Sequence, residues 1–317
     1  MPAILFSDVS KTYGPVTALA GVSFAVGRGE MFGVIGPDGA GKTTAIRLAC
    51  GLLRANGGQV RVLGHDPVTD HRQITGAVGY LSQRFSLYGD LSIDENIAFF
   101  AEIHGVRAYR PARDRLLDMT QLTRFRTRRA DRLSGGMKQK LALACTLVHE
   151  PDVLILDEPT TGVDPVARRE FWKLLSEFLA RGLTIVMATP YLDEAERCGR
   201  VLLLHEGKVL AADEPAVLQS SLAGRLYEVI STTARPPLDA LRSVSGVADA
   251  QGFGERAHVT FRDVPAHDAG GYLRAALAQH GIQVASVRPI GATLEDVFIA
   301  MLTGSGAANA GSGKGLS

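Results

Sequence analysis

The sequence predicts an α/β protein in which a mainly parallel sheet is followed by a smaller α+β module. Three observations lead to this prediction. A glycine-rich turn ending in Lys-Thr stands between an apolar strand and a helix, at residues 36–43. Two buried strands flank an amphipathic helix between residues 153 and 188, and such a β-α-β unit makes a parallel sheet. After about residue 224 the pattern becomes β-α-β-β-α-β, which is typical of a ferredoxin-like module.

Length and composition fit a folded protein of two domains. The chain has 317 residues, of which 46% are hydrophobic and 21% are charged, and these proportions exclude a wholly disordered chain. The formal net charge of +1 gives no overall attraction to nucleic acid, so we expect no nucleic-acid partner. No apolar run approaches the roughly 20 residues that span a bilayer, and no signal-peptide pattern opens the sequence. We therefore expect a cytosolic chain, or one that reaches a membrane through a partner.

The N-terminal third alternates short apolar segments with turns. Residues 4–10 and 21–26 are predicted strands, separated by Gly-Pro at positions 14–15. Gly-Arg-Gly at 27–29 then leads into the buried strand Met31–Ile35, and the glycine-rich turn and a helix follow it.

The middle of the chain, from about residue 90 to 150, is predicted to be helical. Beyond it, the predicted strands 153–156 and 183–188 enclose the predicted helix 169–182. The last predicted helix before residue 150 has one apolar face, and that face consists of Leu141, Ala144, Leu147 and Val148.

Residues 36–43, Gly-Pro-Asp-Gly-Ala-Gly-Lys-Thr, fit the phosphate-loop pattern G-x-x-x-x-G-K-[ST]. The glycines let backbone N–H groups surround phosphate oxygens, and the helix N-terminus adds its dipole. Lys42 is expected to reach the β- and γ-phosphates of ATP, and the hydroxyl of Thr43 to bind Mg²⁺. The alternative is a glycine-rich turn that only opens a helix. The predicted nucleotide-binding residues of this segment are Gly36, Pro37, Asp38, Gly39, Ala40, Gly41, Lys42, Thr43 and Thr44.

Asp157 and Glu158 close the predicted strand 153–156. An acidic residue at the edge of a parallel sheet, beside a phosphate loop, suits a contact with Mg²⁺. Glu158 can then polarise the attacking water as general base. A strand that simply ends in an acidic turn is the alternative, but the combination with the phosphate loop favours the catalytic interpretation.

Residues 133–137, Leu-Ser-Gly-Gly-Met, stand just before a helix and, with Gln139, resemble the signature motif of ATP-binding-cassette (ABC) ATPases. Other elements resemble this family in the same order. Tyr13 lies at the place of the adenine-stacking aromatic residue, and Gln83 at that of the Q-loop glutamine. Asp164, in Gly-Val-Asp, resembles the acidic residue of the D-loop.

The resemblance covers about residues 3–220 and implies a RecA-like core with an antiparallel β-subdomain and a helical subdomain. The segments FSLYGDLSIDENI and ATLEDVFIAMLTG resemble the exporter ATPases related to daunorubicin-resistance proteins and their C-terminal appendage. The resemblance implies an ATP hydrolase that uses Mg²⁺ and acts on a separate permease at the cytoplasmic face of the cell membrane. The implied catalytic residues are Glu158, Gln83 and Asp164, and the implied metal ligands are Thr43, Gln83 and Asp157.

A single phosphate loop covers only one face of a nucleotide, which explains the need for a signature motif. In the family, two cassettes close head to tail, so that the partner's signature covers the γ-phosphate. Here the residues that would do so are Ser134, through its hydroxyl, and Gly135 and Gly136, through backbone N–H groups. The partner can be a second copy or a different ATPase.

One departure from the family pattern concerns the switch position, where a histidine usually follows the strand after the D-loop. This sequence has Pro190 there, in Ala-Thr-Pro-Tyr-Leu-Asp-Glu-Ala-Glu. Proline has neither a side-chain donor nor a backbone N–H, so the usual hydrogen bond to the γ-phosphate cannot form. A milder departure is Asp38, where asparagine is commoner.

Two further groups of residues have simpler interpretations. The cysteines Cys50, Cys145 and Cys198 lie far apart without metal spacing, and we interpret them as small buried residues. The arginines before the signature motif fit a solvated loop, or alternatively a contact with a membrane-domain partner or lipid phosphates. They are Arg124, Arg126, Arg128, Arg129 and Arg132.

The sequence therefore predicts the nucleotide-binding subunit of a membrane exporter, with residues 1–223 as the ATPase domain. Residues 224–303 form the accessory module, and residues 304–317, which are rich in glycine, form a disordered tail. A chromosome-maintenance ATPase is excluded, because too few residues separate Lys42 from Ser134 for a long coiled coil. The ribosomal class of ABC ATPases normally carries two cassettes in one chain, and this sequence contains one. A catalytically weak regulatory subunit, paired with a histidine-bearing ATPase, stays open as the alternative.

Overall fold

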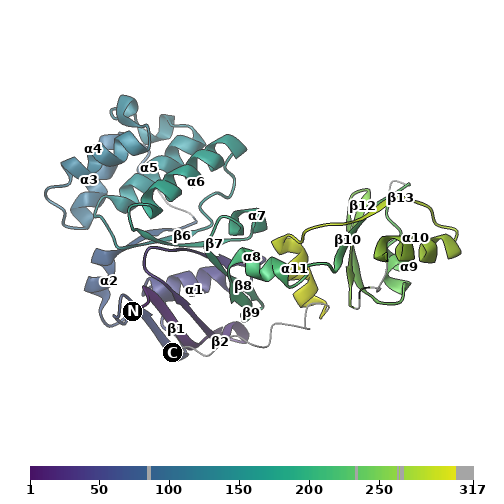
Figure 1. Ribbon diagram of the computed structural model, residues 1–317. Helices are drawn as coiled ribbons and strands as arrows, with labels where there is room; N and C mark the ends of the chain where they lie inside the picture. Colours follow the sequence, from purple (N-terminus) through teal and green to yellow (C-terminus); the bar gives the residue numbers. More distant parts are fainter. Residues whose placement is uncertain (84–86, 233–234, 263, 265–267, 305–317) are drawn as a thin grey trace. The chain divides into compact units, whose positions relative to one another are not determined.

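The computed structural model describes residues 1–83, 87–232, 235–262, 264 and 268–304. They form two compact units that divide between Ala212 and Asp213 (Figure 1). In this part of the chain, no helix has the length and hydropathy needed to cross a membrane.

The boundary between the units differs from the predicted one after residue 223. Helix α8 (Pro215–Ser220) contacts helix α11 (Leu294–Leu302), and this packing groups α8 with the second unit. Of the predicted tail 304–317, all but Gly304 lies outside the described residues.

The core of the first unit is a six-stranded sheet with the order β5 (Val78–Leu81), β6 (Val153–Asp157), β7 (Thr184–Thr189), β3 (Met31–Ile35), β8 (Arg200–His205) and β9 (Lys208–Asp213). The pairs from β5 to β8 are all parallel, which confirms the sheet predicted from the β-α-β unit. Strands β3, β6 and β7 are buried along their whole length, as expected for parallel strands covered by helices. The phosphate loop and the Asp157-Glu158 pair both lie at the carboxyl ends of these strands.

An antiparallel sheet with the order β2 (Val16–Val26), β1 (Ile4–Tyr13) and β4 (Gly57–Val62) completes the core. Helix α1 (Lys42–Ala49) lies between the sheets, since it contacts β2 and β4 as well as β6 and β7. Phe6, Phe24 and Phe32 stack in series across β1, β2 and β3, with ring centroids 4.5 and 5.6 Å apart. Helix α1, which follows the phosphate loop, is thus packed against both sheets.

The helical region predicted between residues 90 and 150 is present (Figure 1). Its first long helix begins at a capping box, in which Ser92 and Glu95 exchange hydrogen bonds with each other's backbone. Besides α1, the α-helices described in the first unit are α2 (His71–Ala77), α3 (Ile93–Ile103), α4 (Arg110–Met119), α5 (Gly135–Leu147), α6 (Pro165–Leu179) and α7 (Leu192–Ala195).

The single apolar face predicted for α5 is too narrow. Its last seven residues, from Leu141 to Leu147, are all buried, including Ala142, Leu143 and Cys145. The reason is that α5 packs against α3, α4, α6 and β5 together, so neighbours surround it on several sides. All three cysteines are buried free thiols, as interpreted from the sequence.

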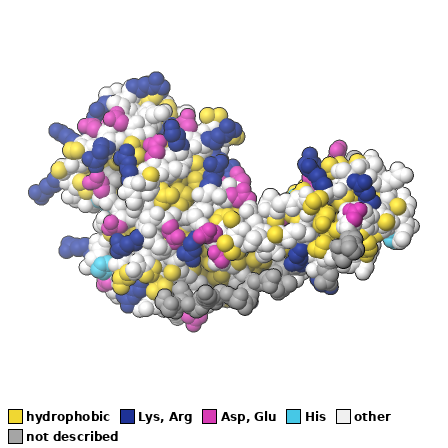
Figure 2. All heavy atoms as spheres, viewed as in Figure 1, with side chains coloured by type: hydrophobic (Ala, Val, Ile, Leu, Met, Phe, Trp, Pro, Cys, Tyr) yellow, Lys and Arg dark blue, Asp and Glu magenta, His cyan; other side chains and the backbone are white. Residues whose placement is uncertain are grey.

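Four of the five arginines before the signature motif make side-chain contacts with described residues of the first unit, namely Arg124, Arg126, Arg128 and Arg129. Arg126 donates to Asp94 at 2.8 Å and to Asp114 at 3.3 Å, and it thereby ties the loop to α3 and α4. Arg124 and Arg128 each lie 4.6 Å from the ring centroid of Phe125. Figure 2 shows basic and acidic side chains interspersed over this helical region. Part of the cluster therefore stabilises the loop, as a solvated connection would require.

The second unit contains the predicted ferredoxin-like arrangement. Its sheet has the order β11-β12-β10-β13, and all three pairs are antiparallel, as the β-α-β-β-α-β pattern predicts. An apolar core that includes Val229, Phe261 and Leu273 lies between this sheet and its helices. The elements are β10 (Leu226–Ser231), α9 (Leu238–Ser243), β11 (Val247–Phe253), β12 (Arg256–Phe261), α10 (Ala269–Gln279) and β13 (Val284–Pro289).

Candidate functional site

The phosphate loop, residues 36–41, connects the end of β3 to the start of α1. Glycine is required at two of its positions. A Cβ atom on Gly36 would lie 2.1 Å from the carbonyl oxygen of Leu204, and one on Gly41 would lie 2.5 Å from that of Ala18. Gly41 also has φ +106°, which only glycine adopts without strain. No side chain caps α1, so its first backbone N–H groups are available to an anion.

Lys42, the first residue of α1, is almost fully buried, and its ammonium group points back into the loop. It donates to the carbonyl oxygens of Gly36, at 2.8 Å, and Pro37, at 3.0 Å. Its Nζ also lies 3.5 Å from Oε1 of Glu158. A buried ammonium needs such partners because it has left water. The geometry brings the predicted phosphate ligand and the predicted general base together.

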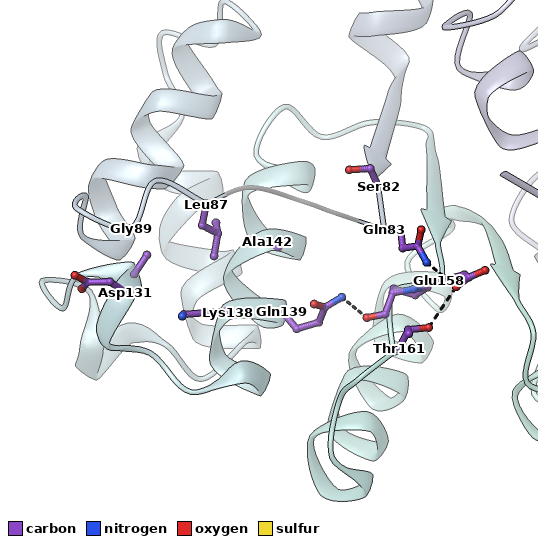
Figure 3. Close-up of a pocket in the computed structure, with 12 residues that line it drawn as sticks. Ser82, Gln83, Leu87, Gly89, Asp131, Lys138, Gln139, Ala142, Glu158 and Thr161 are labelled. Atoms are coloured by element: carbon purple, nitrogen blue, oxygen red, sulfur yellow. Dashed lines mark hydrogen bonds between the residues drawn. The ribbon is translucent and has the colours of Figure 1, made fainter. Parts of the chain in front are cut away.

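Glu158 stands directly after β6 in a strained backbone conformation, with φ +50°. Such a conformation persists only when the surroundings fix it. The backbone N–H of Glu158 donates to the carbonyl of Ala188 at 2.9 Å. Its carboxylate accepts hydrogen bonds from Gln83 at 3.0 Å and from Thr161 at 3.5 Å (Figure 3). Gln83 and Glu158 were both predicted as catalytic, and they are direct neighbours.

Thr43 and Asp157 are the predicted metal ligands that lie in contact. The hydroxyl of Thr43 donates to Oδ1 of Asp157 at 3.0 Å, and Asp157 is 1% exposed. Burial raises the pKa of the Asp157 carboxyl above its ordinary value, although the hydrogen bond from Thr43 acts against this shift. A hydroxyl and a buried carboxylate in contact are hard oxygen ligands, the type that Mg²⁺ prefers. The residues present therefore fit this cation.

A cavity of about 430 Å³ lies beside Glu158, between the sheet edge and α5 (Figure 3). Gln139 of α5 donates to the carbonyl oxygen of Pro159, the residue after Glu158. The signature helix therefore contacts the turn that carries the predicted base. Polar residues that line the cavity are Ser82, Gln83, Asp131, Lys138, Gln139, Glu158 and Thr161.

The signature residues Ser134, Gly135 and Gly136 lie at the N-terminus of α5. Ser134 is the N-cap of α5, and its hydroxyl accepts from the N–H of Met137 at 3.3 Å. Ser134 and Gly135 are exposed, whereas a Cβ on Gly136 would lie 2.6 Å from Cβ of Ala167. Among the described residues, no hydrogen bond or ion pair joins the signature to the phosphate loop.

The remaining predicted residues lie at the surface or at helix ends. Asp164 is the N-cap of α6, and it accepts at 3.0 Å from the N–H groups of Val166 and Ala167. Tyr13 is 44% exposed, and the ammonium of Lys11 lies 5.3 Å from the centroid of its ring. Asp38 is exposed as well.

Sequence reasoning missed Glu194, a buried carboxylate that accepts hydrogen bonds from several side chains. It lies in the short helix α7 and is 1% exposed. Thr160, Thr189 and Arg168 all donate to it. No local pattern marks such a residue, because its partners come from separate segments. The only sequence signal was its place just after the switch position.

Comparisons with known proteins agree with this geometry. Residues 19–161 match the model of a family described as "ABC transporter". The chain is 39% identical over 293 residues to "Probable multidrug ABC transporter ATP-binding protein YbhF" of Escherichia coli (strain K12), covering 91% of this chain and 50% of that protein. It thus spans about half the length of that relative. It is 42% identical over 226 residues to "Nod factor export ATP-binding protein I" of Paraburkholderia xenovorans (strain LB400), covering 70% of this chain and 74% of that protein.

Solved structures resemble the first part of the fold. One, described as an ATP-binding subunit of an ABC transporter, has a TM-score of 0.62 and 30% identity, covering 68% of this chain and 92% of that chain. A dimeric bacterial ABC transporter cassette has a TM-score of 0.60 and 26% identity, covering 67% of this chain and 98% of that chain. A further structure of that cassette is a post-hydrolysis state bound to ADP and Pi, with 25% identity and a TM-score of 0.59, covering 67% of this chain and 98% of that chain.

Proposed function

Because the chain belongs to the ABC transporter family, we propose that it is the ATP-binding and ATP-hydrolysing subunit of a membrane exporter. The names of two relatives, a multidrug transporter protein and a Nod factor export protein, support export as the process. The work of this subunit is to couple ATP-driven closure of a cassette dimer to transport by a separate permease. It acts at the cytoplasmic face of the cell membrane, which it reaches through that permease.

The contact between Lys42 and Glu158, with Gln83 on the other carboxylate oxygen, carries this proposal. The backbone N–H groups of residues 36 and 38–44 and the ammonium of Lys42 bind the phosphates, and Tyr13 stacks on the adenine. Glu158 accepts a proton from the attacking water as general base, and Gln83 orients its carboxylate.

Mg²⁺ fits the contact between Thr43 and Asp157, with Gln83 as a further ligand. When bound, the ion neutralises charge on the β- and γ-phosphates. Gln83 donates to Glu158 through its amide nitrogen, so its amide oxygen stays available to a cation. One side chain can thereby join the metal site to the base.

The exposed Ser134 and Gly135 support a head-to-tail dimer, in which each signature completes the partner's site. The dimeric state of a cassette relative with 26% identity supports the same assembly. We assign residues 1–223 to the cassette and residues 224–303 to an accessory module that regulates or stabilises the dimer. The module contains no phosphate loop in its sequence, so nucleotide binding belongs to the first part.

A second candidate function follows from Pro190, which lies directly after β7 at the switch position. The chain is then a catalytically weak regulatory subunit. Its Leu-Ser-Gly-Gly-Met motif completes the site of a second, histidine-bearing ATPase, and the partner supplies the switch histidine for that site.

The test is equilibrium binding of Mg²⁺-ATP and steady-state hydrolysis by the purified full chain, compared with Lys42→Ala. Loss of the buried ammonium removes its phosphate contacts, so we expect ATP affinity to fall about 10²-fold or more. Arg54→Ala is the matched control, since this exposed basic residue lies in the loop after α1. If Lys42→Ala binds ATP as tightly as the wild type, this use of the loop is wrong.

A further inference from the structure

A buried carboxylate connects the catalytic turn, defined here as residues 158–164, to the switch segment, residues 189–191. Glu194 is 1% exposed, and a buried charge of this kind is tolerated only when donors surround it. Its Oε1 accepts from the hydroxyl of Thr160 at 2.6 Å, from Nε of Arg168 at 2.6 Å and from the indole of Trp172 at 3.4 Å. Its Oε2 accepts from the hydroxyl of Thr189 at 2.7 Å. Four donors from three segments therefore converge on one side chain.

The hydrogen bond from Thr160 to Oε1 of Glu194 fixes the catalytic turn. Thr160 is two residues after Glu158 and 3% exposed. The turn closes with the N–H of Thr161 on the carbonyl of Glu158 at 3.3 Å, and the N–H of Val163 on the carbonyl of Thr160 at 3.1 Å. Glu158 needs such support because its backbone has φ +50°. Arg168, one turn after the N-cap Asp164, adds the start of α6 to the same anchor.

The hydrogen bond from Thr189 to Oε2 of Glu194 fixes the switch segment. Thr189 is fully buried and is the last residue of β7. Its hydroxyl donates to Glu194 and accepts the backbone N–H of Tyr191 at 3.1 Å, so it spans Pro190. The ring of Tyr191 packs 4.8 Å from the guanidinium carbon of Arg168, which closes the network on itself.

We propose that Glu194 is a positioning residue that holds the catalytic turn and the switch segment in one arrangement, so that Glu158 is correctly aimed at the γ-phosphate. This inference rests on the proposed ATP hydrolysis. Among the described residues, no hydrogen bond or ion pair joins Glu194 to the phosphate loop or to Asp157. Disturbing the network should therefore lower kcat and leave ATP binding largely unchanged.

Single-arm variants test this proposal, because Glu194→Ala would strand the buried part of Arg168 and could unfold the chain. Thr160→Val removes the hydroxyl of the catalytic arm, and Thr189→Val removes that of the switch arm, both without loss of volume. Thr184→Val is the matched control: Thr184 begins the same strand β7, is 2% exposed, and accepts a hydrogen bond from the N–H of Gly29 instead. Trp172, the only tryptophan in the sequence, reports on the carboxylate through its emission.

We expect Thr160→Val and Thr189→Val each to lower kcat about tenfold, while KM for ATP stays within about twofold of the wild type. Because both arms meet at one carboxylate, the double variant should lose about as much as either single variant. Emission of Trp172 should shift in both variants and not in Thr184→Val.

Two results would contradict this inference and leave the proposed function intact. In the first, the wild type hydrolyses ATP, and Thr160→Val and Thr189→Val hydrolyse it at the same rate as Thr184→Val. In the second, the rate losses of the two single variants multiply in the double variant. A wild-type chain without any ATP turnover would instead overturn the proposed function, and this inference with it.

Discussion

The ammonium of Lys42 lies 3.5 Å from the carboxylate of Glu158, although the two residues follow different strands of the central sheet. Strands β3 and β6 are parallel to the strand β7 between them, so their carboxyl ends meet at one edge. ATP phosphates would compete with Glu158 for this ammonium. Phosphate binding and release of the base are thereby linked through one contact.

The first prediction concerns the switch position. Pro190→His restores a side-chain donor, so we expect faster ATP turnover by the chain alone if one missing donor limits the rate. Removing one transition-state donor typically costs about 10²-fold or more, so the gain should be large enough to measure. Steady-state turnover, alone and with any second ATPase of the same transporter, is the measurement.

The control for this substitution is Pro190→Ala, which restores a backbone N–H without a side-chain donor. A fast wild-type homodimer whose rate is unchanged or lowered by Pro190→His would contradict the weak regulatory subunit. Glu158 and a bound water would then suffice for hydrolysis.

The second prediction concerns the accessory module. A chain ending at residue 223 should bind ATP with nearly the affinity of the full chain, because all predicted nucleotide ligands precede that residue. The six-stranded sheet and its helices lie before α8. Isothermal titration of both chains with Mg²⁺-ATP checks this. A folded, shortened chain that has lost ATP binding would show that the module forms part of the nucleotide site.

The third prediction concerns pH. The ring of His149 stacks on that of His104, with centroids 3.8 Å apart and planes 5° from parallel. Burial, and then the charge of His104, lower the pKa of His149 from 6.5 to about 4. Because the unfolded chain binds this proton more tightly, the free energy of unfolding falls as the pH drops from about 6.5 towards about 4. Between pH 7 and pH 5 the loss from this group should be about 2 kcal/mol.

His149→Phe keeps a stacked aromatic ring and removes the titrating group, so it is the matched variant. We expect urea unfolding of the wild type to depend more steeply on pH than that of His149→Phe between pH 5 and pH 7. Equal slopes for the two chains would show that the stacked pair does not hold His149 neutral.

The motifs of the site and much of the topology could be predicted from the sequence. The phosphate loop, the Asp157-Glu158 pair and the order of the ferredoxin-like elements each depend on residues close together in the chain, so pattern and spacing predicted them. Strand β4 and helix α2 were not predicted. Both are short, and much of their surface is exposed, so no strong apolar period marks them.

Contacts between distant segments were beyond the reach of sequence patterns. Glu194 gathers donors from the catalytic turn, α6 and β7, and the contact of Gln139 with Pro159 joins α5 to the same turn. The burial of Leu143, which lies outside the predicted apolar face of α5, has the same cause. Each depends on the tertiary packing of elements, which a local period does not specify.

The most direct test of the account is Glu158→Gln in the full chain, with binding and hydrolysis of Mg²⁺-ATP measured on the same sample. The variant keeps the shape of the side chain and removes the base and the negative charge beside Lys42. We predict ATP binding at least as tight as in the wild type, turnover lowered by about 10²-fold or more, and an ATP-bound dimer that accumulates. Hydrolysis at the wild-type rate by Glu158→Gln would contradict the assignment of Glu158 as the base.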